Sequence, residues 1–307
     1  MSCVKDRFNP LIIYINTLIE NLNADCIPEE IDLVLDGGAF NGGYQLGILI
    51  YLNQLEKNKH INICKISGCS VGAIFGVLYI ANRLDKGVEY YEKLLNHYSC
   101  NSNLTELSNV IKEFVNNYVD DVTIFNDKLY ITYYDLENVQ QKIVSTYKNK
   151  EELIEAMIKS SYLPYIIDGN LQYKECCDGF LPYIFPENKR EILYICLHPF
   201  QKIKNMLCVK NENNVWPRVL TGIVDINNFL SNLKSEFCSY RNKWSLRETY
   251  FFRIKEFIVL LIILFINVLK KILENIPSGI KNNIYIERIL VILKSLYKDI
   301  FRHIIIN

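Results

Sequence analysis

The chain has 307 residues, of which 50% are hydrophobic and 22% charged, so it can form a sizeable core and is not a disordered protein. Its 34 basic and 34 acidic residues cancel. That balance argues against a general nucleic-acid binder, because such proteins carry a basic excess.

The N-terminal region carries no signal peptide pattern, because its apolar stretch at residues 11–13 is short and follows the acidic Asp6. The 10 cysteines are scattered, without a CxxC pair or a Cys/His metal spacing. We therefore expect a cytoplasmic protein with free thiols. Residues 10–23 predict a short amphipathic helix, and residues 1–28 are interpreted as a helical extension.

Two strand–turn–helix units follow this extension. The apolar residues 31–35 end at Asp36-Gly37-Gly38 and are typical of a buried strand, and a helix is expected over residues 45–55. A second strand at residues 61–66 precedes another glycine turn and a helix over residues 71–83. This alternation predicts an α/β fold with a parallel sheet.

The rest of the central region, taken as one domain over residues 29–235, contains further candidate elements. Strands are predicted at residues 129–134 and 192–197. Helices are predicted at residues 88–97, 104–117 and 136–147. The polar residues 210–217 end in a proline and predict a surface loop.

The composition changes after about Ser235, and residues 236–307 predict an apolar and amphipathic helical tail. Residues 257–269 include no charged residue, but this run of 13 is shorter than the ~20 that a helix needs to cross a bilayer. Residues 284–305 repeat apolar side chains at helical spacing. The tail either packs against the domain or lies in a membrane surface. The basic Lys270 and Lys271 beside the apolar stripe favour the membrane.

The motif that most directly suggests a catalytic residue is Gly68-Cys69-Ser70-Val71-Gly72. It is a G-x-S-x-G sequence between a predicted strand and a predicted helix. Such a turn exposes a serine hydroxyl in strained backbone geometry, and the glycines let the chain pass without clashes. The plainer alternative is a strand-to-helix turn in which Ser70 is only the N-cap residue.

A glycine-rich segment, residues 36–43, also lies between a strand and a helix. Its clustered glycines form a natural nest of backbone donors for an anion. It fits neither the dinucleotide fingerprint, which would require glycine in place of Ala39, nor the phosphate-binding P-loop. An oxyanion hole that serves Ser70 is the better interpretation, and a tight loop needed only for packing is the alternative.

A third motif, Asp178-Gly179, supplies a candidate base for Ser70. On the sequence alone it would be an ordinary turn. The chain has 4 histidines, and none lies in a recognisable motif. His198, at the end of a predicted strand, is kept as a reserve base.

Together these motifs resemble those of the patatin-like phospholipases, which carry a loop G-G-G-x-K/R-G, a G-x-S-x-G elbow and a later D-G-G/A. Here they stand as Gly37-Gly38-Ala39-Phe40-Asn41-Gly42, Gly68-Cys69-Ser70-Val71-Gly72 and Asp178-Gly179-Phe180. Residues 159–165 are similar to the small-residue and proline segment that precedes the family's aspartate. The resemblance covers about residues 31–186.

The resemblance implies a three-layer α/β/α fold with a central, mostly parallel sheet, to which the tail adds a helical C-terminal extension. It implies a Ser70–Asp178 dyad without histidine, no metal or other cofactor, and hydrolysis of fatty acyl esters in phospholipids or glycerolipids. The glycine-rich loop would be the oxyanion hole, with Gly37, Gly38, Ala39, Asn41 and Gly42 as its residues. The expected donors are the backbone amides of Gly38 and Ala39 and the side chain of Asn41.

The sequence departs from the family pattern at Ala39, Asn41 and Phe180. Alanine disfavours a positive φ, and Asn41 supplies no positive charge. The loss of one oxyanion donor costs ~10²–10³ in turnover, so an alternative is a catalytically weak or inactive membrane-binding protein with the same fold. A soluble thioesterase or protease would leave the apolar tail unexplained.

Overall fold

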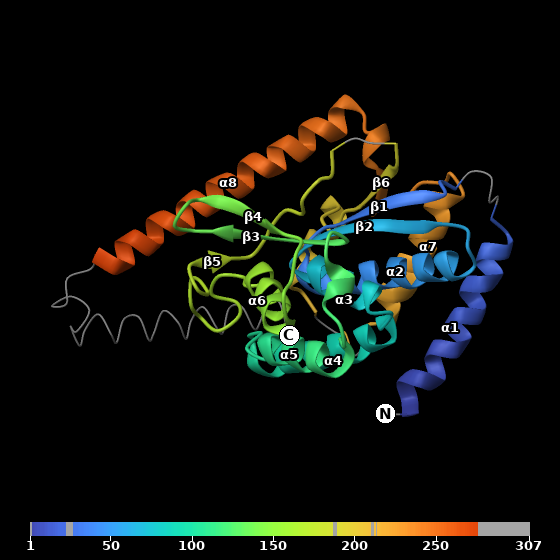
Figure 1. The fold of residues 1–307 in the computed structure, drawn as a ribbon, viewed down its shortest axis with the longest axis horizontal. Helices are drawn as coiled ribbons and strands as arrows, with labels where there is room; N and C mark the ends of the chain where they lie inside the picture. Colours follow the sequence, from blue (N-terminus) through green and yellow to red (C-terminus); the bar gives the residue numbers. More distant parts are fainter. Residues whose placement is uncertain (1, 23–26, 187–188, 210–211, 213, 276–307) are drawn as a thin grey trace.

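The computed structural model describes residues 2–22, 27–186, 189–209, 212 and 214–275 (Figure 1). The helix predicted at residues 284–305 lies outside the described residues. The α-helices of the described part are α1 (Ser2–Glu20), α2 (Gly42–Lys57), α3 (Val71–Ile80), α4 (Leu84–Asn101), α5 (Leu107–Tyr118), α6 (Lys150–Ser160), α7 (Trp216–Leu230) and α8 (Leu246–Asn275). The strands are β1 (Glu30–Leu35), β2 (Asn62–Cys69), β3 (Leu129–Asp135), β4 (Gln140–Val144), β5 (Cys176–Cys177), β6 (Glu191–Ile195) and β7 (Cys238–Tyr240).

The strands form one seven-stranded sheet in the order β4-β3-β2-β1-β6-β7, and β5 also pairs with β3. The four central strands are parallel to one another, whereas β4, β5 and β7 are antiparallel to their neighbours. The mostly parallel α/β/α fold predicted from the sequence is confirmed. Because β7 pairs with β6, the sheet extends beyond the domain boundary expected at residue 235.

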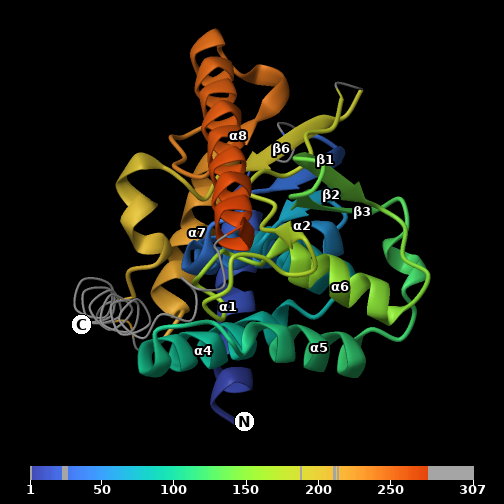
Figure 2. The same cartoon turned by 90° about the vertical axis from the view of Figure 1, so that its left-hand side faces the viewer.

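Helices cover both faces of the sheet. Leu33 and Leu35 of β1 point into the main core, with α2, α3 and α7. Val34 of β1 and Tyr194 of β6 point to the other face, where they pack near Phe252 of α8. Figures 1 and 2 show α8 on the opposite side of the molecule from α4 and α5. Buried apolar strands of this kind are typical of parallel sheets that are covered on both sides.

The N-terminal extension forms part of the same core. Helix α1 begins earlier than the sequence predicts and includes Pro10. Its side chains Leu11, Ile15 and Ile19 are buried in the main core. Among the described cysteines, eight are free thiols, as expected.

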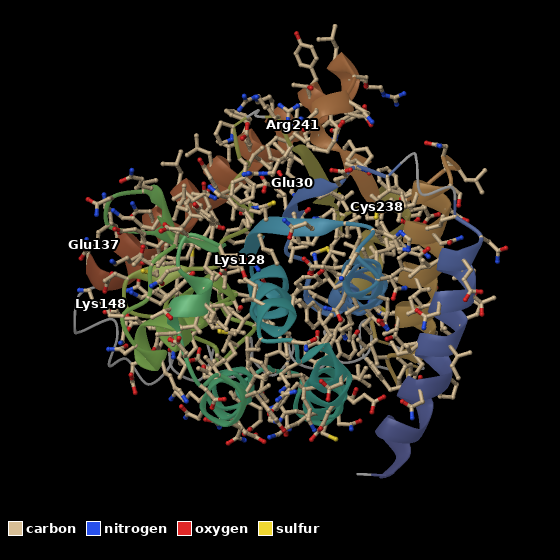
Figure 3. All side chains as sticks on the ribbon, turned by 45° about the vertical axis from the view of Figure 1, so that its right-hand side comes forward. Glu30, Lys128, Glu137, Lys148, Cys238 and Arg241 are labelled. Carbon is tan, nitrogen blue, oxygen red and sulfur yellow. The ribbon has the colours of Figure 1, made fainter. Side chains whose placement is uncertain are left out.

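The helix predicted at residues 136–147 is wrong, because this segment forms a turn and then strand β4. Asp135 accepts the backbone N–H groups of Glu137 and Asn138, which fixes the turn, and β4 then pairs with β3. Glu137 lies at the outside of this hairpin (Figure 3). Pairing with the neighbouring strand outweighs the weak helical pattern of the segment.

The apolar run at residues 257–269 lies within α8, which packs on the domain along one side. Val259, Ile263 and Ile266 are buried there, against residues from the β3–β4 turn and from the segment around β5. The opposite side of α8 remains exposed and strongly apolar. No helix in the described ranges is both long enough and apolar enough to cross a bilayer.

Candidate active site

The predicted site residues meet at the carboxyl ends of the strands. The glycine-rich loop follows β1, Ser70 follows β2, and His198 comes shortly after β6, while Asp178 follows the antiparallel β5, which pairs with the carboxyl end of β3. Ligands of open α/β sheets bind at this edge, because the loops there converge. The fold therefore brings together three motifs that lie far apart in the sequence.

Ser70 lies on a sharp turn between β2 and α3. Its φ of 53° and ψ of −128° are strained for a residue with a side chain. A Cβ on Gly68 would lie 2.6 Å from the backbone of Gly72, and a Cβ on Gly72 would lie 2.5 Å from the carbonyl oxygen of Leu35. Only glycine fits at these two positions. The Ser70 hydroxyl makes no capping hydrogen bond, so the residue is not an ordinary N-cap.

A serine that we did not assign from the sequence holds the turn in place. Ser160, fully buried at the end of α6, accepts the backbone N–H of Ser70 at its Oγ, at 2.9 Å. Its carbonyl accepts the N–H of Gly179 at 3.0 Å. Ser160 therefore ties the Ser70 turn to the segment that carries Asp178. Ser160 belongs to residues 159–165, which resemble a segment of the family, but that resemblance did not indicate what its side chain does.

Asp178 is nearly fully buried beside Ser70. Its Oδ1 accepts the N–H of Phe180 at 2.8 Å, while Oδ2 is buried without a hydrogen bond of ordinary geometry to any described residue. Burial raises the pKa of Asp178 to about 7, and the negative charge of Asp36 adds to this. The hydrogen bond from Phe180 and the nearby Ser70 hydroxyl act in the opposite direction. A carboxyl group with this pKa can exchange a proton near neutral pH.

The amides of the glycine-rich loop are not equivalent. The N–H of Gly37 donates to Oδ1 of Asp36 at 3.1 Å, and the N–H of Gly42 is used within the turn. Among the hydrogen bonds of the described residues, none uses the N–H of Gly38 or Ala39. These two amides remain available to an anion. Ala39 has a φ of 45°, a left-handed conformation that costs alanine about 1–2 kcal/mol.

The expectation that the Asn41 side chain lines the oxyanion hole is corrected by its contacts. The side chain is fully buried, and its amide nitrogen donates to the carbonyls of Leu197 at 2.8 Å and Lys202 at 3.0 Å. Its Oδ1 accepts Nη1 of Arg218 at 3.0 Å. Both amide hydrogens are therefore in use, so Asn41 anchors the loop to the segment after β6.

Replacing Asn41 with leucine is expected to destabilise the fold by about 2–4 kcal/mol, because it leaves several buried polar groups unpaired. Urea unfolding would measure this loss. The matched control is Asn101→Leu, which changes an exposed asparagine and should shift the free energy of unfolding by no more than ~0.5 kcal/mol. Equal stabilities of the two variants would contradict an anchoring role.

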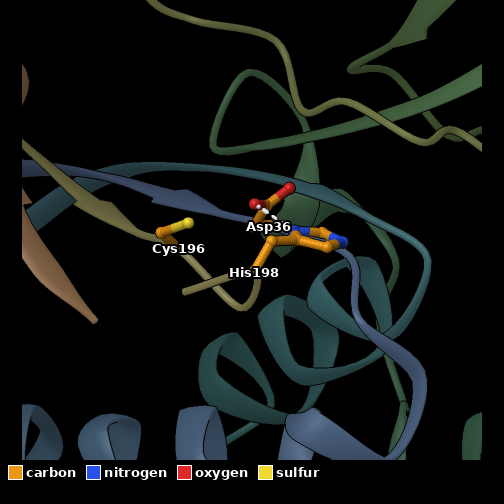
Figure 4. Close-up of side chains that lie close together, drawn as sticks. All are labelled: Asp36, Cys196 and His198. Atoms are coloured by element: carbon orange, nitrogen blue, oxygen red, sulfur yellow. Dashed lines mark hydrogen bonds and ion pairs between the residues drawn. The ribbon is translucent and has the colours of Figure 1, made fainter. Parts of the chain in front are cut away.

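A cluster of polar side chains surrounds Asp36, directly before the glycine-rich loop. Asp36 is fully buried, and its Oδ2 accepts Tyr194 Oη at 2.9 Å, His198 Nδ1 at 2.8 Å and Lys255 Nζ at 2.6 Å. Figure 4 shows the contact between Asp36 and His198. Burial opposes ionisation, but the charges of Lys255 and His198 outweigh it and hold the pKa of Asp36 below its usual range.

The same cluster bears on two sequence expectations. His198, the reserve base, is bonded to Asp36 rather than to Ser70. Asp36, Cys196 and His198 offer ligand atoms within 4.8 Å of one another, which is a possible metal set. The ammonium of Lys255, however, lies 2.6 Å from Asp36 and 3.3 Å from His198 Nδ1. It therefore occupies the place beside the carboxylate that a metal ion would take.

An apolar cavity of about 90 Å³ adjoins Ser70. Ala39 and Phe40 of the loop line it, and α3, α4, α5 and the end of α6 supply its other walls. One water needs about 10–15 Å³ of such space, so the cavity has room for a hydrocarbon chain several carbons long. Ser161 also lines the cavity, and its buried Oγ has no hydrogen-bond partner among the described residues.

A protein-family model described as Patatin-like phospholipase matches residues 33–183. The matched span begins within β1 and includes the glycine-rich loop, Ser70 and Asp178. It ends before β6, α7 and α8. A search of curated proteins found no match.

Proposed function

We propose, on the premise that residues 33–183 make this chain a member of the patatin-like phospholipase family, that Ser70 and Asp178 are the catalytic dyad of a lipid acyl hydrolase. The observation that carries the proposal is the position of Ser70. Its strained turn lies beside a buried carboxyl group whose pKa is about 7 and beside an apolar cavity. Nucleophile, base and acyl site are thus within one small region.

In the first step, the Ser70 hydroxyl attacks the carbonyl carbon of an acyl ester while Asp178 takes its proton. The backbone amides of Gly38 and Ala39 stabilise the oxyanion that forms, because neither is used by the described residues. The alcohol part of the lipid leaves with the proton from Asp178, and the acyl group remains on Ser70.

In the second step, water attacks the acyl-enzyme. Asp178 accepts a proton from that water and returns it to the Ser70 oxygen as the fatty acid leaves. No metal or cofactor takes part in either step of the proposal. The apolar cavity favours a fatty acyl chain, so phospholipids and glycerolipids are the proposed substrates.

The alternative is a membrane-binding protein with little or no catalytic activity. The strained Ala39 and the neutral Asn41 favour it, because both depart from the family's loop. The free amides of Gly38 and Ala39 and the raised pKa of Asp178 favour the enzyme.

Labelling with a fluorophosphonate tests the proposed function, because this probe reacts with nucleophilic serines. We expect one labelled peptide, with the label on Ser70, and hydrolysis of short-chain and phospholipid esters by the same protein. A protein that is folded, takes no label and hydrolyses no ester would overturn the proposal in favour of the inactive alternative.

We further propose that α8 attaches the protein to a membrane surface. The side of α8 that faces away from the domain exposes a continuous set of large apolar side chains, with half or more of several of them accessible. These are Phe251, Ile254, Phe257, Ile258, Leu261, Phe265, Val268 and Ile272. Soluble monomers rarely expose an apolar patch of this kind, and a lipid hydrolase draws its substrate from a membrane.

The triple replacement Phe257→Ser, Leu261→Ser and Phe265→Ser is expected to reduce sedimentation with anionic liposomes at least tenfold. Each side chain loses the ~1.5–3 kcal/mol that burial in lipid would provide. The matched control is Ile13→Ser on α1, which is 67% exposed but lies away from α8. Unchanged sedimentation of the folded triple variant would contradict attachment through this face.

A further inference from the structure

We propose that Lys255 of α8 is a positioning residue for the glycine-rich loop, which it acts on through the buried carboxylate of Asp36. The inference rests on the proposed function, because it assigns the loop to the oxyanion site. It also gives the C-terminal helix a role in catalysis that is separate from membrane attachment.

Asp36 connects α8 to the loop through its two carboxylate oxygens. Oδ2 receives Lys255, and Oδ1 accepts the N–H of Gly37, the residue directly before the free amides of Gly38 and Ala39. The backbone of Asp36 is fixed as well, because its N–H donates to Ile195 and its carbonyl accepts Gln45. Lys255 is therefore two hydrogen bonds away from the start of the oxyanion loop.

The energetics make Lys255 the dominant partner of Asp36. A fully buried carboxylate without a counter-charge is strongly disfavoured, and removing one member of such a pair costs more than the pair contributes. Tyr194 and His198 also donate to this oxygen, but Lys255 lies nearest to it, at 2.6 Å, and its charge acts most strongly on Asp36. Without Lys255 the carboxylate would reorient toward solvent or take up a proton, and in either case its bond to Gly37 would weaken.

The position of α8 does not depend on this ion pair. Val259, Ile263 and Ile266 hold the helix against the domain, and Phe252 packs with Tyr194 and Trp244. The packing of α8 thus holds Lys255 at a fixed position beside the glycine-rich loop. Lys255, Tyr194 and His198 all lie beyond residue 183, so the support of this loop comes from outside the span that matches the family.

The test compares Lys255→Met with Lys255→Arg, which keeps the charge, and with Lys93→Met, which breaks an exposed ion pair with Glu113. Two quantities are measured on the full chain. One is amide hydrogen exchange of the peptide that covers residues 33–44. The other is kcat and KM for a short soluble ester.

For Lys255→Met we expect loop exchange at least tenfold faster than in the wild type, and kcat at least tenfold lower with a KM within about twofold. The reason is that displaced oxyanion amides impair the transition state rather than substrate binding. Lys255→Arg should recover part of both losses, and Lys93→Met should match the wild type. A folded Lys255→Met protein with wild-type exchange and kcat would overturn the proposal.

If Lys255→Met does not fold, Lys255→Gln decides the question, because it removes the charge but keeps a polar group that can donate to the same carboxylate oxygen. Faster loop exchange and a lower kcat in that variant support the proposal, whereas wild-type values of both overturn it. Hydrogen exchange needs no activity. A wild-type chain that neither labels nor hydrolyses esters would therefore refute the proposed function, while the exchange data still decide the role of Lys255.

Discussion

Replacing Ser70 with alanine is expected to abolish fluorophosphonate labelling and to lower kcat for ester hydrolysis by at least ~10⁴-fold, because the nucleophile is lost. The overall fold should persist, since the Ser70 hydroxyl makes no capping hydrogen bond and the backbone N–H that Ser160 accepts is retained. Steady-state hydrolysis of a short soluble ester and mass spectrometry of the labelled protein measure the two effects.

A second variant, Ser70→Gly, serves as the matched control for backbone strain. It should be equally inactive but more stable than Ser70→Ala, by about 1–2 kcal/mol, because glycine tolerates a φ of 53°. Hydrolysis by a folded Ser70→Ala protein at the wild-type rate would place the nucleophile elsewhere and remove the basis of the proposed function.

The parts of the site that could be predicted from the sequence are those that depend on local sterics. The turns after β1 and β2 require particular residues at fixed spacing, and Gly68 and Gly72 show why, since the chain leaves no space for a side chain there. The same reasoning predicted the strands before both turns. For these turns and strands, the residues of one short segment were sufficient for the prediction.

Features that depend on distant partners could not be predicted in this way. Residues 136–147 carry a weak helical pattern, yet the neighbouring strand β3 makes the segment a hairpin. Asn41 has the right place in the loop for an oxyanion role, but its side chain is bonded to residues more than 150 positions away. Lys255 and Asp36 are separated by 219 positions, so no local motif marks their contact.

The two alternatives that the sequence suggested for the tail do not exclude each other. We expected residues 257–269 either to pack against the domain or to lie in a membrane surface. In the structure one side of α8 is buried, through Val259, Ile263 and Ile266, while the other side is exposed and apolar. Removing the tail would therefore uncover part of the core and take Lys255 away from Asp36, which would keep only its contacts with Tyr194, His198 and Gly37. Point variants on each side of α8 separate its two proposed roles better than truncation does.

Asp178→Asn is expected to lower kcat by about 10²–10⁴-fold, because asparagine cannot accept the proton of Ser70. The variant should fold, since its side-chain oxygen can still accept the N–H of Phe180. His198→Asn is the comparison, because His198 is bonded to Asp36 and not to Ser70, and it should lose much less activity than Asp178→Asn. A loss in His198→Asn equal to that in Asp178→Asn would indicate a triad and contradict the dyad.

The pH dependence gives this prediction a second measurement. Ionised Asp178 is the active form, so kcat/KM of the wild type should rise with pH and level off above about 7, and the residual activity of Asp178→Asn should lack this rise. Stability should follow the opposite course. Because burial raises the pKa of Asp178 in the folded state above the unfolded value of ~4, its contribution is complete below pH ~4 and is lost as the pH approaches 7. Wild-type stability should therefore fall between pH 4 and 7 relative to that of Asp178→Asn. Parallel stability curves for the two proteins would contradict the raised pKa of Asp178 in the folded state.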